Sequence, residues 1–127
     1  MKYGFSKTVD MSYEQAIEKV TAELKKEGFG VLTSNDVKDT LKKKLGVDFK
    51  RYVILGACNP TFAHQSLQEE EELGLLLPCN VIVYEKEGKA RVSIFDPMVM
   101  NKLIENPKIE SIAQQVKEKL QRLLAAV

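Results

Sequence analysis

The chain has 127 residues, which is the size of one domain, and its 19 basic and 18 acidic residues give a net charge of +1. This balance argues against a dedicated nucleic-acid binder, which usually carries a basic excess. No apolar run follows the charged N-terminus and no apolar stretch approaches about 20 residues, so we expect neither a signal peptide nor a membrane span. We therefore expect a cytosolic protein whose two cysteines stay reduced.

The first third of the chain alternates strand and helix patterns. Apolar and polar side chains alternate over residues 3–9, which predicts a half-buried strand. Ser12 and Gln15 have the spacing of a capping box, and the helix that follows ends at Gly28. Residues 29–33 then form a second, short strand.

A second helix and a strongly apolar strand come next. Val37, Leu41 and Leu45 are spaced by four and predict a helix with a narrow apolar stripe, ended by Gly46. Residues 51–57 carry apolar side chains on both faces of a strand. Such a strand is either central and covered twice or lies at a subunit interface.

Asn59 and Pro60 occupy the cap and first position of a third helix. Four consecutive glutamates, residues 69–72, then fall in its last turn, where they oppose the helix dipole and one another. We expect this end to fray and the glutamates to be solvated. The alternative is that they contact a cation or a basic partner.

The last part of the chain predicts a hairpin and a long helix. Residues 79–84 and 91–95 read as paired strands joined by a turn at 85–89, and residues 98–104 read as a helical turn. Asn106 caps the most amphipathic helix, which runs nearly to the C-terminal end. The elements together predict an α+β fold: a single, mostly antiparallel sheet with helices packed mainly on one face.

The chemistry of interest lies in two Cys-Asn pairs, Cys58-Asn59 and Cys79-Asn80. Cys58 ends a predicted strand directly before a helix N-terminus, where the dipole and free amides lower the pKa of a thiol and favour bound anions. The simpler interpretation is that both cysteines are small core residues, since buried free cysteine is common.

A metal site is a further hypothesis. Cys58, His64 and Cys79 would supply three ligands to a zinc-like soft metal ion, although their spacing does not match the close Cys-x-x-Cys pairs of structural zinc sites. The simpler interpretation of His64 is that it is a partly exposed surface residue. In another alternative, Cys58 is the reactive thiol of a redox enzyme and Cys79 resolves it, which requires a low thiol pKa and access to solvent.

Four segments resemble the small prokaryotic domain-of-unknown-function family number three hundred and two: residues 36–46, 52–60, 76–81 and 96–97. The Cys-Asn-Pro and Leu-Pro-Cys-Asn pieces are the specific ones, and the resemblance covers nearly the whole chain. It implies an α+β fold similar to the TATA-binding-protein-like, helix-grip class, and a homodimer. It implies no established activity.

An apolar run supports the dimer independently. Leu73 and the consecutive residues 75–77 follow the glutamates, and a strand or loop would hide only alternate members of such a run. The remainder would form an exposed patch that a two-fold partner could cover. The alternative is that the chain covers the run itself.

We therefore expect a dimeric binding module with a small-molecule or soft-metal ligand near Cys58, Asn59, His64 and Cys79, with Asn80 as a further ligand-binding residue. A thiol-dependent redox enzyme and an interaction domain without a ligand are the alternatives.

Overall fold

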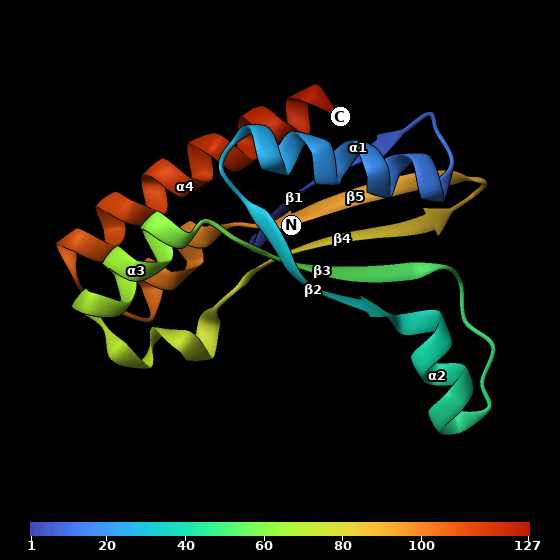
Figure 1. Ribbon diagram of the computed structural model, residues 1–127, viewed down its shortest axis with the longest axis horizontal. Coiled ribbons are helices and arrows are strands. Elements are labelled where there is room, and N and C mark those ends of the chain that lie inside the picture. Colours follow the sequence, from blue (N-terminus) through green and yellow to red (C-terminus); the bar gives the residue numbers. More distant parts are fainter.

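The computed structural model describes all 127 residues as one sheet with helices gathered on one side (Figure 1). The strands are β1 (Gly4–Val9), β2 (Gly30–Asp36), β3 (Tyr52–Cys58), β4 (Cys79–Lys86) and β5 (Lys89–Phe95). The α-helices are α1 (Tyr13–Lys26), α2 (Val37–Leu45), α3 (Pro60–Glu69) and α4 (Pro107–Ala126). Two 3-10 helices complete the chain: η1 (Glu71–Leu76) and η2 (Pro97–Lys102).

The five strands are ordered β1-β5-β4-β3-β2, and every neighbouring pair is antiparallel. Helices α1 and α4 lie over the same face, whereas α2 projects beyond one end of the sheet and α3 lies at the other (Figure 1). This arrangement confirms the predicted α+β class. None of the helices combines the length and the hydrophobicity needed to cross a bilayer.

The main core lies between the inward face of the sheet and the helices α1 and α4. Because side chains alternate across a strand, β3 directs Val53, Leu55 and Ala57 to this side, and all three are buried. Leu24 of α1 and Leu120 of α4 are fully excluded from solvent above them. Burial of these apolar side chains is the main term that holds the helices to the sheet.

The opposite face of β3 is not covered by any helix of the chain. Tyr52 and Ile54 lie there and are only half-buried. The apolar character of both faces therefore does not reflect burial on two sides within one subunit. Of the two interpretations offered by the sequence, cover on both faces within one chain is therefore wrong, and a subunit interface at this face stays a prediction.

A second, smaller core forms beyond the end of the sheet, where α3, η1, η2 and the start of α4 meet. Leu73, Met100, Ile109 and Ala113 are its buried members. Asn106 caps α4 and Asp96 caps η2 through side-chain oxygens that accept backbone N–H groups. These caps orient the segments that enclose the site described below.

The sequence predicted that the glutamates 69–72 all lie in the last turn of one helix, and the structure does not place them there. Helix α3 ends at Glu69, and Glu71 and Glu72 occupy the first turn of η1. A helix N-terminus attracts negative charge. The break at Glu70 therefore removes two carboxylates from an unfavourable position and places them in a favourable one.

The leucine run is also arranged differently from the expectation. Leu73, Leu75 and Leu76 lie within the 3-10 helix η1, in which residues three apart lie on the same side. Leu73 is 1% exposed, and Leu76 packs against the same small core, whereas Leu75 is 83% exposed. The chain thus covers most of the run itself, and only Leu75 remains available to a partner.

The homodimer stays a prediction, now centred on Leu75. If two chains associate through this end, a Leu75→Glu variant should sediment at the 14.3 kDa of one chain, because it forces carboxylates into an apolar contact. Wild-type protein and a Leu32→Glu control, altered at a leucine of similar exposure (66%), should sediment at twice that mass. A monomeric wild type at micromolar concentration would contradict the dimer.

Candidate functional site

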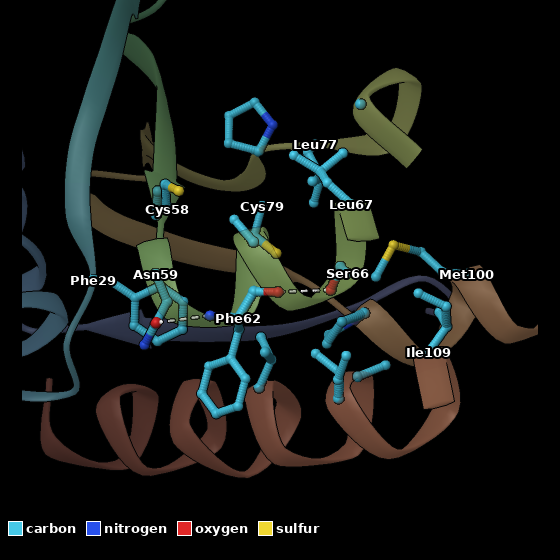
Figure 2. A pocket seen from close by; sticks show the side chains of 18 of the residues that line it. Phe29, Cys58, Asn59, Phe62, Ser66, Leu67, Leu77, Cys79, Met100 and Ile109 are labelled. Carbon is cyan, nitrogen blue, oxygen red and sulfur yellow. Dashed lines mark hydrogen bonds between the residues drawn. The ribbon is translucent and has the colours of Figure 1, made fainter. Parts of the chain in front are cut away.

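A cavity of about 280 Å³ opens beyond the end of the sheet, between α3, η1 and α4 (Figure 2). Hydrophobic residues make up 14 of the 19 that line it, and none of the 19 is charged. The fold brings these side chains together from β2, β3, α3, η1, β4, η2, α4 and the residues next to them. Those labelled in the figure are Phe29, Cys58, Asn59, Phe62, Ser66, Leu67, Leu77, Cys79, Met100 and Ile109.

Helix α3 forms one wall and is positioned by Asn59. The Asn59 Oδ1 atom accepts a hydrogen bond from the Phe62 backbone N–H at 3.3 Å, and Pro60 takes the first helical position. The predicted cap is therefore confirmed. Behind Asn59 lies Gly28, which has a φ of +84° and leaves only 3.1 Å between an added Cβ and the Asn59 Nδ2 atom. A side chain at residue 28 would thus disturb the cap as well as strain the backbone.

Ser66 is the other polar side chain of α3 in the wall, and it is buried. Its hydroxyl donates to the Phe62 carbonyl at 2.7 Å, one turn earlier (Figure 2). With its proton engaged in the helix, Ser66 offers the cavity only acceptor lone pairs. The wall is therefore close to apolar in character.

Cys58 and Cys79 both line the cavity but do not form a pair. In the β3–β4 register Ala57 lies opposite Cys79, so Cys79 shares the inward face with Ala57 and Cys58 points to the other face. Their sulfur atoms are not directed at each other in Figure 2. Both cysteines are free.

The two thiols differ in environment. Cys79 is only 8% exposed, and burial, with a smaller effect of Cys58, raises the pKa of its thiol to about 11. At neutral pH it is therefore a neutral thiol with little nucleophilic character. Cys58 is half-buried at the end of β3, directly before the α3 cap. This arrangement gives no support to a redox pair in which Cys79 resolves Cys58.

The remaining predicted site residues lie outside the cavity. His64 is exposed on α3, and Asn80 is exposed on the uncovered face of the sheet, because β4 alternation sends it away from Cys79. The structure contains no group of three or more His, Cys, Asp or Glu side chains that could hold a metal ion. Cys58, His64 and Cys79 are thus not brought together as ligands.

Several lining residues had no sequence signal beyond hydrophobicity. Met100 comes from η2 and Ile109 from α4, and Phe29 lies directly before β2. Each reads in the sequence as an ordinary core residue. Only the packing of α4 against both η2 and α3 shows that they face a space rather than another side chain.

Comparisons with known proteins agree on one family. The family model described as "Domain of unknown function DUF302" matches residues 5–127. A crystal structure of an uncharacterized conserved protein DUF302 from Bacillus stearothermophilus matches with a TM-score of 0.91 and 31% sequence identity. The match covers 99% of this chain and 98% of that one. No curated protein matches the chain.

Removing the Asn59 cap should cost about 1 kcal/mol of unfolding free energy, or about 3–5 °C in Tm for a domain of this size. We expect Asn59→Ala to show this loss in thermal denaturation. Asn59→Ser should retain most of the stability, since serine also caps well. An unchanged melting curve for the alanine variant would argue that the cap does not hold α3.

The thiols should differ in reactivity at pH 7.5. In a Cys79→Ser variant, Cys58 should react with iodoacetamide, because it is partly open to solvent. In a Cys58→Ser variant, Cys79 should react far more slowly, because a thiol of pKa about 11 is almost wholly protonated and sealed at this pH. The rate should rise as pH approaches 11. Mass spectrometry measures both rates, and equal rates would refute the assigned burial of Cys79.

Proposed function

Because the chain belongs to the family described as "Domain of unknown function DUF302", a description that states no activity, we propose a function from the site itself. The protein binds a small, neutral, mostly apolar molecule in the cavity between α3, η1 and α4. The observation that carries this proposal is a cavity of about 280 Å³ whose lining includes no charged side chain.

The size of the cavity supports a compact ligand. An apolar cavity of about 150 Å³ in a protein interior stays dry and accepts benzene. The cavity here, at about 280 Å³, is nearly twice as large and lies near the lower end of small-molecule pockets. A molecule of two fused rings, or a branched hydrocarbon group of similar volume, matches that space.

The lining supports a neutral ligand. An ion moved into this cavity would lose its hydration and meet no opposite charge, which costs several kcal/mol. Phe29, Phe62 and Met100 instead offer apolar and polarizable surface. The Cys58 thiol and the Asn59 amide lie at one end, where they can orient a single polar group of the ligand.

The alternative functions have less support. A soft metal ion needs converging ligands, and Cys58 and Cys79 project from opposite faces of the sheet with His64 outside the cavity. A thiol enzyme using Cys58 with Cys79 requires two accessible thiols, and Cys79 is buried. Binding without catalysis is the function that this geometry favours.

The test is thermal denaturation with benzene, indole and naphthalene as probes. A probe at ten times its Kd should raise the stability by about 1.4 kcal/mol, or about 4–7 °C in Tm. Ala63→Phe, which places a ring in the half-buried α3 wall, should abolish the shift.

The matched control is Ala22→Phe, the same change at an exposed position of α1, which should keep the shift. If none of the probes stabilises the wild type up to its solubility limit, or if Ala63→Phe responds as the wild type does, the cavity is not a binding site for apolar molecules.

A further inference from the structure

The uncovered face of the sheet carries a second candidate site, distinct from the cavity. A groove of about 650 Å³ runs across the outward sides of β1, β5, β4 and β3. Of the 15 residues that line it, three are cations and none is a carboxylate, in a chain that has 18 acidic residues in all. The near-zero net charge of the sequence therefore conceals an uneven distribution.

The cations of the groove have no acidic partner in the chain. Lys50, Lys86 and Arg91 form no ion pair, and the Arg91 Nη1 atom donates only to the Thr8 hydroxyl at 2.9 Å. The β4–β5 register adds Lys89, which lies opposite Lys86 on the same face. Glu87 lies beside Lys86, Lys89 and Arg91 at the hairpin, so this end of the face has three cations against one carboxylate and keeps a net positive charge.

Aromatic rings lie between these charges. Tyr52 of β3 and Tyr84 of β4 face each other across the strands and stack, with 5.2 Å between ring centroids and 14° between planes. The Lys50 Nζ atom lies 5.2 Å from the centroid of the Tyr84 ring. Phe95 of β5 lines the same groove. Tyr52 and Tyr84 are half-buried and stack on one another, so each leaves one ring face for a ligand, whereas Phe95 also packs against the second core.

A second copy of the chain fits this face poorly. A two-fold contact places the same surface on both sides, so each groove would bring unpaired cations to another groove that holds no carboxylate. Like charges across an interface cost several kcal/mol. The charge of the face calls for an anionic partner, and its rings call for a planar, apolar component.

We propose that this face binds single-stranded nucleic acid. Bases stack on the free ring faces of Tyr52 and Tyr84, and phosphates pair with Lys50, Lys86 and Arg91. Sheets with exposed aromatics and a cationic groove bind single strands in this way, because unpaired bases offer a free face for stacking. The groove crosses four strands, at about 4.8 Å per strand, which suits several linked nucleotides better than one free nucleotide.

Fluorescence anisotropy with a labelled 12-nucleotide single strand of mixed sequence, as DNA and as RNA, tests the proposal. Three phosphate contacts predict that affinity falls roughly 20-fold between 50 and 200 mM salt. Tyr84→Ala should weaken binding five-fold or more, whereas Tyr84→Phe, which keeps the ring, should bind as the wild type does. Lys86→Ala should reduce the salt dependence, and the matched control Lys25→Ala, on the exposed side of α1, should not.

Three results would overturn the proposal. One is no change in anisotropy at 50 mM salt with 100 µM protein. Another is wild-type affinity in a folded Tyr84→Ala variant, which would leave charge alone as the cause. The last is a wild-type dimer that Tyr84→Ala dissociates, which would assign the face to a second copy. None of these results bears on the cavity, whose Ala63→Phe variant should bind the strand normally.

Discussion

The structure depends on the burial of one face of the sheet and not the other. Helices α1 and α4 cover the inward side of β5, β4 and β3, and the alternation of side chains then assigns each strand residue to one environment. Val81 and Val83 are fully buried, whereas Ile82 and Tyr84 between and beyond them are half-exposed. A register shift of one residue would exchange these sets, so the hydrophobic free energy of the core also fixes what the open face presents.

The cavity arises where this sheet packing ends. Beyond the last residues of β3 and the first of β4, α4 continues and meets α3, η1 and η2 rather than strands (Figure 1). The second core fills part of that space with Leu73, Met100 and Ile109. The side chains contributed by α3 do not fill the rest, which leaves an apolar space between α3, η1, η2, α4 and the ends of the strands.

The two candidate sites differ in chemistry because of this division. The cavity holds no charge and takes its character from core side chains, so it favours neutral apolar molecules. The open face has no core to complete, and its residues are amphipathic rings and long cationic side chains that tolerate water. Asn80 shows how sharply the two are separated, since it follows Cys79 in the chain yet lies in the groove and not in the cavity.

The sequence by itself determined the features that depend on neighbours within about four residues. The capping box of Ser12 and Gln15, the Asn59 cap and the positions of nearly all the strands follow from local hydrogen bonds and from the period of apolar residues. The family resemblance added the expectation of a homodimer, which no part of the fold decides.

Only the tertiary structure decided how distant residues meet. Cys79 lies opposite Ala57 and projects inward with it, whereas Cys58 projects to the other face of the sheet. The two cysteines are therefore not a pair, although both line the same cavity. The leucine run forms part of the 3-10 helix η1, and the buried side of η1 packs in the second core with Met100 and Ile109, which lie far along the chain. Likewise, Lys50, Lys86 and Arg91 are ordinary surface cations in the sequence, and only the pairing of β3, β4 and β5 gathers them on one face, since strand order depends on long-range contacts.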